Sequence, residues 1–257
     1  MVTHDIAFII LAAGIGKRMK SNKAKVLHEI LGKPMIYYVL DTVCSISDKN
    51  IYVVVGHQSE SVKMSIENQY KVNYVTQECQ LGTGHAVSCA IPLIDQKINS
   101  VVILCGDTPL ISNTSIKSLI RTHNYSNNDL TVLAVKMDNP YGYGRILFSK
   151  DQQITGIVEE ADATEEQRKI NVVNSGIYCV ERRYLQKSIN SLSNKNAQME
   201  MYLTDIVGYG YNNHNKLAAV ISENQNEMFG VNTHEDLLRI ESYMKTKLKN
   251  VDIPIMQ

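Results

Sequence analysis

Four short apolar runs, rich in β-branched residues, recur through the first half of the chain with segments of helical length between them. They cover residues 6–12, 51–55, 72–76 and 101–105. Strands that alternate with helices form crossover units, in which parallel strands share one sheet and helices cover its two faces. The alternation therefore predicts an α/β fold with a doubly wound, mostly parallel sheet.

After about residue 128 the strand-like runs follow one another more closely. They cover residues 130–136, 145–148, 153–158 and 172–180. Neighbouring strands joined by short turns pair antiparallel, so we expect some of these strands to form a β-rich subregion. No linker rich in Pro, Gly and Ser interrupts the 257 residues, which favours one domain over two.

Helical patterns occupy the longer gaps between these runs and the last part of the chain. Proline suits the first position of a helix, so Pro34 is expected to begin one. The predicted helices cover residues 34–46, 113–123, 181–191, 197–211 and 234–249, and a short strand is expected near residues 217–221.

The composition excludes several classes of protein. Lys and Arg number 26, and so do Asp and Glu, so the basic excess typical of nucleic-acid binding is missing. Five cysteines without a C-x-x-C pair argue against a disulfide framework and a structural zinc site. No segment approaches the ~20 apolar residues of a membrane helix, and residues 6–12 suit a buried strand better than a signal peptide. We expect a cytoplasmic protein without nucleic-acid or membrane partners.

The loop after the first strand combines small residues with positive charge. It reads LAAGIGKR over residues 11–18, and small residues let backbone N–H groups approach an anion. Ligands of parallel sheets bind beyond the carboxyl ends of the strands, where this loop begins. An anion site is therefore favoured over the alternative, a solvated surface loop. The basic residues around it are Lys17, Arg18, Lys20, Lys23 and Lys25.

Two familiar phosphate-binding motifs do not fit this loop. A P-loop needs GxxxxGK followed by Ser or Thr, and no such run exists in the chain. A dinucleotide fingerprint needs a third glycine where Met19 stands. Neither a P-loop ATPase nor a nicotinamide enzyme is supported.

A series of motifs in register resembles the sugar-phosphate nucleotidylyltransferases. The series opens with LAAGIGKRM and, seven residues after Arg18, Lys25, although Ala24 stands where the family usually has proline. The order of the motifs is that of the uridylyltransferase half of the family's bifunctional members, and the match covers nearly the whole chain. The later motifs are QLGTGHA (residues 80–86), GDTPL (106–110), GYGR (142–145), GIVE (156–159), NSG (174–176), TD (204–205) and GVN (230–232).

The resemblance implies a single Rossmann-like nucleotidyltransferase domain over residues 1–257. Residues 1–128 would mainly bind nucleotide, residues 129–232 would mainly bind sugar, and residues 233–257 would form a C-terminal helix and tail. The bifunctional members continue into an acetyltransferase β-helix of hexapeptide repeats, and no hexapeptide period occurs here. We therefore expect uridylyl transfer alone, and we leave the oligomeric state open, with a monomer as one option.

The implied reaction is attack of a sugar 1-phosphate oxygen on the α-phosphorus of UTP. With N-acetylglucosamine 1-phosphate the products are UDP-N-acetylglucosamine and pyrophosphate. A phosphate monoester is already largely dianionic at neutral pH, so neither a protein nucleophile nor a general base is required. The protein must align the reactants and supply positive charge. Arg18 is the candidate for the leaving pyrophosphate, and Lys25 for the sugar phosphate or α-phosphate.

Asp107 directly follows the fourth apolar run, so its carboxylate should emerge at the carboxyl edge of the sheet. A hard oxygen ligand beside phosphates suits Mg²⁺. The resemblance adds the amide oxygen of Asn232 as a second ligand. The alternative for Asp107 is a turn or a helix N-cap residue.

The resemblance also implies the substrate-binding residues. Gln77 would recognise the base, unless it is an ordinary surface residue, and Glu159 would bind sugar, unless it is a solvated strand end. The full set is Leu11, Ala12, Ala13, Gly14, Gln77, Gly82, Thr83, Cys105, Gly106, Gly144, Glu159, Asn174 and Asn232.

Two departures from the family pattern lie near the inferred sugar site. Glu160 and Ala161 follow Glu159, where a basic residue or histidine is expected, and Cys105 stands where Tyr or another polar residue is frequent. Two alternatives therefore remain: transfer to another sugar 1-phosphate, such as glucose 1-phosphate, and a catalytically silent module that binds nucleotide sugars.

Overall fold

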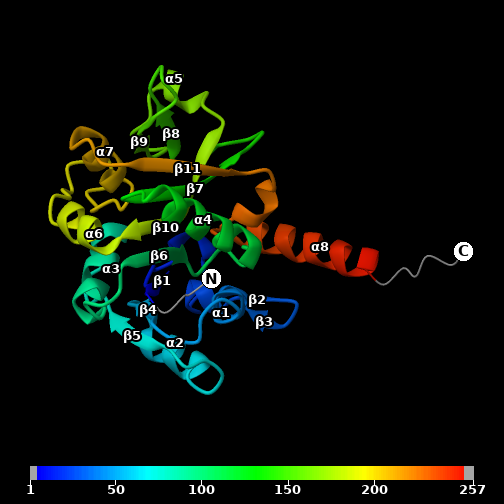
Figure 1. Cartoon of the computed structure of the whole chain (residues 1–257). Coiled ribbons are helices and arrows are strands. Elements are labelled where there is room, and N and C mark those ends of the chain that lie inside the picture. Colours follow the sequence, from blue (N-terminus) through cyan, green and yellow to red (C-terminus); the bar gives the residue numbers. More distant parts are fainter. Residues whose placement is uncertain (1–4, 252–257) are drawn as a thin grey trace, which may run out of the picture.

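The computed structural model describes residues 5–251, and nine of its strands join in one sheet with helices on both faces (Figure 1). Along the continuous path of seven strands, only β10 runs antiparallel to its neighbours. The predicted mostly parallel α/β fold is confirmed. In spatial order the strands are β11 (Leu217–Ser222), β7 (Leu130–Lys136), β10 (Val172–Glu181), β6 (Ser100–Cys105), β1 (Ile6–Ala12), β4 (Ile51–Val55) and β5 (Asn73–Thr76).

The remaining strands form two hairpins. β8 and β9 pair antiparallel, and β8 joins the edge of β10 through the pair Arg145 and Val173. β2 and β3 form a separate two-stranded sheet. Their bounds are β2 (Glu29–Ile30), β3 (Lys33–Pro34), β8 (Arg145–Phe148) and β9 (Ile154–Val158).

Eight α-helices and four short 3₁₀ helices connect the strands within the described residues. The α-helices are α1 (Met35–Cys44), α2 (Ser59–Ile66), α3 (Thr83–Ala90), α4 (Asn113–Ser126), α5 (Glu165–Arg168), α6 (Arg182–Ile189), α7 (Asp205–Asn212) and α8 (His234–Val251). The 3₁₀ helices are η1 (Lys17–Met19), η2 (Lys25–Leu27), η3 (Ile91–Leu93) and η4 (Gln225–Met228).

Each face of the sheet has its own apolar layer, because successive residues of a strand point to opposite faces. Phe8 and Ile10 of β1 lie in the layer that includes α1, α2 and α4. Ala7 and Ile9 lie in the layer that includes α3, α6 and α7. All four residues have no exposed surface. β1 is therefore buried from both sides, which explains its continuous apolar sequence.

Two helix predictions need correction. The helix expected over residues 197–211 begins only at Asp205, because the backbone of Met201 is bonded to Leu81 and Gly84 instead of to a helical turn. Pro34 precedes α1 with extended backbone (ψ 134°) and pairs in β3, so the helix begins at Met35. Helices α2, α3 and α5 carried no predicted bounds.

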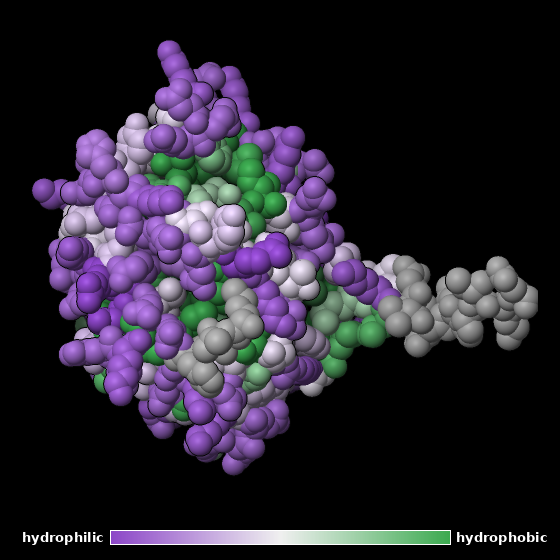
Figure 2. All heavy atoms as spheres, in the orientation of Figure 1, coloured by the Kyte–Doolittle hydropathy of each residue, from purple (hydrophilic) through white to green (hydrophobic). Residues whose placement is uncertain are grey.

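The last described helix, α8, extends away from the body of the molecule (Figure 1). Its first turns are held by Leu237 and Ile240, which pack with Met19, Ile30 and Met35. Hydrophilic side chains cover most of the face drawn in Figure 2. Among the residues that the structure describes, no helix is both long enough and apolar enough to span a membrane. The predicted tail at residues 252–257 lies outside them.

Candidate active site

A cleft of about 580 Å³ lies at the carboxyl ends of β1 and β6. The chain leaves β1 toward β4 and β5 on one side and then returns to β6 on the other, so this is the switch point at which open α/β sheets bind ligands. Predicted site residues that line the cleft are Leu11, Ala12, Ala13, Gly14, Arg18, Lys25, Gln77, Gly82, Thr83, Cys105, Asp107 and Asn232.

Four predicted residues do not line this cleft: Gly106, Gly144, Glu159 and Asn174. Gly106 lies directly behind its wall, where its N–H donates to the carbonyl of Leu11 (2.9 Å). The other three form a separate group beside the cleft, described below.

The backbone of the glycine loop packs closely against the side chain of Lys25. Gly16 has φ +66°, and a Cβ added there would lie 2.7 Å from Cβ of Lys25. Only glycine combines this left-handed conformation with such a close approach. Gly16 ends the loop at the start of η1, so the chain turns back and η2 begins at Lys25. The spacing of the two motif residues thus follows from how the loop packs.

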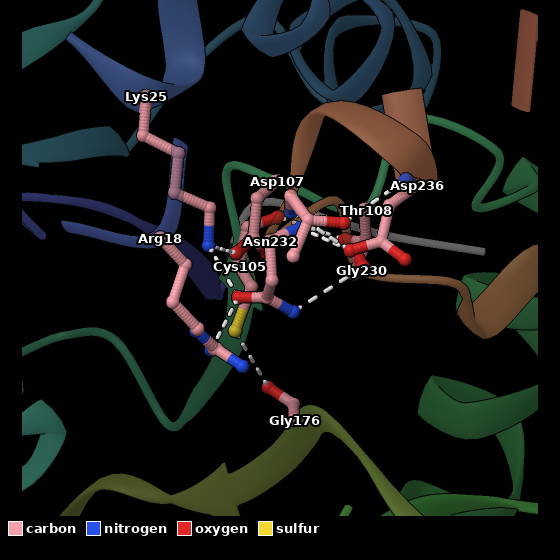
Figure 3. Close-up of polar contacts among 10 residues, drawn as sticks. Arg18, Lys25, Cys105, Asp107, Thr108, Gly176, Gly230, Asn232 and Asp236 are labelled. Atoms are coloured by element: carbon pink, nitrogen blue, oxygen red, sulfur yellow. Dashed lines mark hydrogen bonds and ion pairs between the residues drawn. The ribbon is translucent and has the colours of Figure 1, made fainter. Parts of the chain in front are cut away.

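Four polar side chains converge at the floor of the cleft (Figure 3), and we call them the cleft cluster: Arg18, Lys25, Asp107 and Asn232. Nζ of Lys25 forms an ion pair with Asp107 and donates to Oδ1 of Asn232 (2.8 Å). Nη2 of Arg18 donates to the same Oδ1 (2.9 Å). Two cations therefore share one amide oxygen, and their remaining N–H groups are available to an anion in the cleft.

Backbone contacts hold the two acceptors of the cleft cluster in place. Asp107 follows β6, and its carbonyl accepts from Val231 N (2.9 Å). The N–H groups of Asn232 and Thr233 both donate to Oδ2 of Asp236 (2.9 and 2.8 Å), which fixes Asn232 at the start of α8. Asp107 lies in a turn, as its alternative interpretation proposed, but Ser112 rather than Asp107 caps the next helix.

The donor set of the cleft cluster fits a magnesium ion. A carboxylate oxygen of Asp107 and the amide oxygen of Asn232 both reach the ammonium of Lys25. Mg²⁺ prefers oxygen ligands and takes few from protein when phosphates supply the rest. Because Lys25 contacts both oxygens, a metal bound by both would compete with its ammonium. Within residues 5–251 no group of three or more His, Cys, Asp and Glu forms a metal cluster.

Gln77 joins the cleft wall to the start of α3. It is 3 % exposed, so its interpretation as an ordinary surface residue is wrong. Its Nε2 donates to the carbonyl of Gly82 (3.1 Å) and to Nδ1 of His85 (3.0 Å). Gly82 has φ +110°, and an added Cβ would lie 2.6 Å from the carbonyl oxygen of Met201. The glycine is required because the segment around Met201 crosses so close.

That crossing segment supplies two cleft residues that sequence reasoning missed, Gln198 and Glu200. Met201 N donates to the carbonyl of Leu81 (2.8 Å), and Leu203 N donates to Oγ1 of Thr83 (3.0 Å). The segment thus forms one side of the cleft. A helix was predicted over it, and none of the motifs lies between Gln198 and Leu203, because the nearest one, at residues 204–205, follows them.

The group beside the cleft consists of Gly144, Glu159 and Asn174. Asn174 N donates to the carbonyl of Gly144 (2.8 Å), and a Cβ at Gly144 would lie 3.2 Å from Oε2 of Glu159. Thr204 donates to Oε1 of Glu159 (3.0 Å), and Nδ2 of Asn174 donates to the hydroxyl of Tyr178 (2.7 Å). The three predicted sugar-binding residues are therefore mutual neighbours.

Burial dominates the electrostatics of this group. It raises the pKa of Glu159, although the hydrogen bond from Thr204 opposes the shift. Burial and the nearby Asp107 carboxylate raise the pKa of Cys105 to about 12, so its thiol is neutral and no nucleophile at neutral pH. Cys105 lines the cleft, and its Sγ lies 3.7 Å from the carbonyl of Gly176.

Comparison with known proteins identifies the family of the chain. The family model described as nucleotidyl transferase matches residues 7–249. The chain belongs to the nucleotidyl transferase family.

Curated relatives carry the name bifunctional protein GlmU. Those from Trichlorobacter lovleyi and Thermoanaerobacter pseudethanolicus are 40% and 43% identical over 94% and 95% of this chain, and the match covers 53% of each relative. The relative from Geotalea uraniireducens is 48% identical over 79% of this chain and 45% of its own length. The chain thus spans about half the length of the relatives it matches.

A solved structure from Bacillus anthracis, named as a glucose-1-phosphate thymidylyltransferase in complex with a sucrose, has the same fold. The TM-score is 0.72 over 98% of both chains, with 18% sequence identity. At that identity the likeness concerns the fold alone.

Proposed function

We propose that this chain transfers a uridylyl group from UTP to N-acetylglucosamine 1-phosphate, giving UDP-N-acetylglucosamine and pyrophosphate. The observation that carries the proposal is the cleft cluster at the switch point of a nucleotidyl transferase fold. Two cations and two hard oxygen acceptors meet beside a glycine loop there. The GlmU relatives and the order of the motifs support the choice of uridylyl transfer.

The chemistry requires one bond to form and one to break. A phosphate oxygen of the sugar 1-phosphate attacks the α-phosphorus of UTP, and the bond to the bridging oxygen of pyrophosphate breaks. The attacking oxygen is already anionic and pyrophosphate leaves as an anion, so no protein group needs to accept a proton. The neutral thiol of Cys105 is consistent with this scheme, because no covalent intermediate is needed.

Arg18 and Lys25 would supply positive charge to the reacting phosphates. Both already donate to Asn232, and both side chains line the cleft. An arriving triphosphate offers stronger acceptors than an amide oxygen, so we expect both cations to turn part of their hydrogen bonding toward it. Their largest effect is expected in the transition state, where negative charge spreads onto the leaving group.

Asp107 and Asn232 would hold Mg²⁺ against the phosphates of UTP. When bound, the ion neutralises phosphate charge and helps to orient the nucleotide. Gln77 and the Gly82–Thr83 turn would face the base, and Gly144, Glu159 and Asn174 would bind the sugar. A polar site of this kind rejects an analogue that leaves its buried groups unpaired.

A pyrophosphate-release assay tests the proposal. We expect release from UTP plus N-acetylglucosamine 1-phosphate in the presence of Mg²⁺, and none with chelator. Release with glucose 1-phosphate but not with the N-acetylated substrate would overturn the sugar assignment. Calorimetric binding of UDP-N-acetylglucosamine without release from any sugar phosphate would indicate a silent binding module.

A further inference from the structure

We propose that Glu160 is a positioning residue, which holds the Gly142–Gly144 turn and thereby the sugar-binding group Gly144, Glu159 and Asn174. The inference rests on the proposed function, because it assigns the sugar phosphate to that group. Glu160 departs from the family pattern and has no role in the chemistry above. Its contacts explain why a carboxylate stands there.

Glu160 belongs to a small ion cluster, which we call the anchor cluster: Arg145, Glu160 and Arg168. Nη1 of Arg145 lies 2.7 Å from Oε2 of Glu160, and Nε of Arg168 lies 3.2 Å from Oε1. The side chain of Arg145 is 2 % exposed, that of Glu160 is 22 % exposed and that of Arg168 is 47 % exposed. A guanidinium as buried as Arg145 requires a carboxylate partner, and Glu160 is its ion-pair partner.

The same carboxylate fixes the turn before β8. Oε2 of Glu160 accepts from the N–H of Gly142 (3.0 Å), and Arg145 donates to the carbonyl of Tyr143. Gly142 has φ +85°, and nothing lies within 4 Å of where its Cβ would be. The neighbouring residue Tyr143 has contacts of its own, because its N–H donates to the carbonyl of Pro140 (3.2 Å) and its side chain packs against the core, whereas the Gly142 N–H has its acceptor in Glu160.

Strand register then transmits this placement to the sugar-binding group. Arg145 pairs with Val158 of β9 on one side and with Val173 of β10 on the other. The neighbours of these three residues are Gly144, Glu159 and Asn174, which face one another. A shift of the turn therefore moves Gly144 relative to both of its partners.

Loss of the Glu160 charge should also change the contacts of the Glu159 carboxylate directly. Arg145 is close enough to Glu159 to lower the pKa of that carboxyl, although burial raises it more. Without Glu160, Glu159 is an acidic neighbour whose carboxyl the buried guanidinium already influences. We expect Arg145 to turn toward Glu159 and to compete with the sugar for its carboxylate.

The test compares E160Q, which keeps the shape but removes the charge, with E166A on the nearby helix α5. Glu166 is 82 % exposed and forms an ion pair with Lys169 across one helical turn. For E160Q we expect KM for N-acetylglucosamine 1-phosphate to rise by ~10-fold or more, since displaced positioning groups have effects of this size. KM for UTP should stay within about twofold, and E166A should match the wild type in both constants.

Hydrogen exchange of residues 139–144 gives a readout that does not depend on turnover. E160Q should exchange faster there than the wild type and E166A. A variant R145M/E160M leaves no buried charge unpaired, so it keeps the test open if E160Q does not fold. Its KM for the sugar phosphate should be raised as well.

The outcomes separate the two proposals. Unchanged KM for the sugar phosphate together with unchanged exchange would overturn the positioning role, and an equal rise of both KM values would show a merely structural role instead. If the wild type releases no pyrophosphate from these substrates, the proposed function fails, and the exchange of residues 139–144 alone decides whether Glu160 holds the turn.

Discussion

The cleft cluster and the anchor cluster each combine basic side chains with a carboxylate, yet they differ in what surrounds them. Lys25 and Asp107 line an open cleft, and their partners are an amide oxygen and each other. Arg145 is closed off from solvent, and its partners are Glu160 and backbone carbonyls. Charges of the first kind can exchange partners with an arriving phosphate. The buried guanidinium of Arg145 fixes a loop instead, and a ligand cannot reach it without displacing that loop.

The largest effects on activity are expected when the cleft cluster loses one of its two cations. R18A and K25A should each lower kcat by roughly 10² or more, because each removes a preorganised donor to transition-state charge. Steady-state kinetics of pyrophosphate release measure this, with K169A as the control, since Lys169 is 69 % exposed and forms an ion pair with Glu166. A rise in KM with unchanged kcat would show uniform binding of substrate and transition state instead.

A change at Asp107, an acceptor of the cleft cluster, should affect the Mg²⁺ dependence of the reaction more than the stability of the fold. D107N keeps an oxygen but loses the charge, so the Mg²⁺ concentration for half-maximal rate should rise by ~10-fold or more, as a lost charge-assisted contact is worth about 1.5–3 kcal/mol. Thermal unfolding should change little, because Asp107 remains bonded through its backbone to Val231. An unchanged metal dependence would contradict the assignment of Asp107 as a ligand.

A substitution at Gly16, which packs against Lys25 of the cleft cluster, should have a smaller effect on activity than the substitutions above. G16A forces a side chain into a left-handed conformation and against Cβ of Lys25, so we expect a loss of about 1–3 kcal/mol of stability and a lower kcat. G208A is the matched control, because nothing lies within 4 Å of the added Cβ in helix α7 and alanine favours helix. Equal melting temperatures for G16A and the wild type would show that the loop adapts.

The smallest effects concern pH and the two adjacent glutamates. Burial raises the pKa of Glu159, so the folded state holds its proton longer and its contribution to stability falls as pH rises between the ordinary and the raised value. At Glu160 burial is outweighed by the Gly142 N–H and by Arg145 and Arg168, which together lower its pKa. Its contribution is present above the ordinary carboxyl range and is lost as pH falls through the lowered value.

Urea unfolding as a function of pH checks these opposite signs. The free energy of unfolding of the wild type relative to E159Q should fall as pH rises, and relative to E160Q it should increase. Slopes of the same sign for both variants would mean that the two carboxylates share one environment, contrary to their contacts with Thr204 and Arg145.

The fold was largely predictable because the apolar residues of the strands themselves show that the strands are buried. Residues 6–12 are apolar throughout because both faces of β1 are covered, and the alternation with helices indicated parallel pairing. The failure at residues 197–204 has a physical cause. Tyr202 and Leu203 are buried against the rest of the domain, and a short apolar spacing does not show whether the backbone bonds to itself or, as at Met201, to a distant loop.

The cleft cluster was predictable in part, and its two oxygen acceptors, Asp107 and Asn232, were predicted for different reasons. The position of Asp107 after an apolar strand placed it at the carboxyl edge of the sheet on physical grounds alone. Asn232 followed only from the resemblance, because no local pattern shows that the start of α8 returns to that edge. Gln198 and Glu200 depend on contacts between segments far apart in sequence, and the anchor cluster depends on how the side chains of a hairpin and the following helix meet, so no spacing rule contains that information.

The antiparallel strand β10 also determines the order in which the sheet can be completed. β1, β4, β5 and β6 come from the first 105 residues and can pair before the rest of the chain is made. The free edge of β6 finds its partner only when residues 172–181 arrive and insert between β6 and β7. During synthesis that apolar edge is a site for wrong pairing between chains. Fragments that end before residue 172 are therefore expected to aggregate, even though they contain the entire glycine loop.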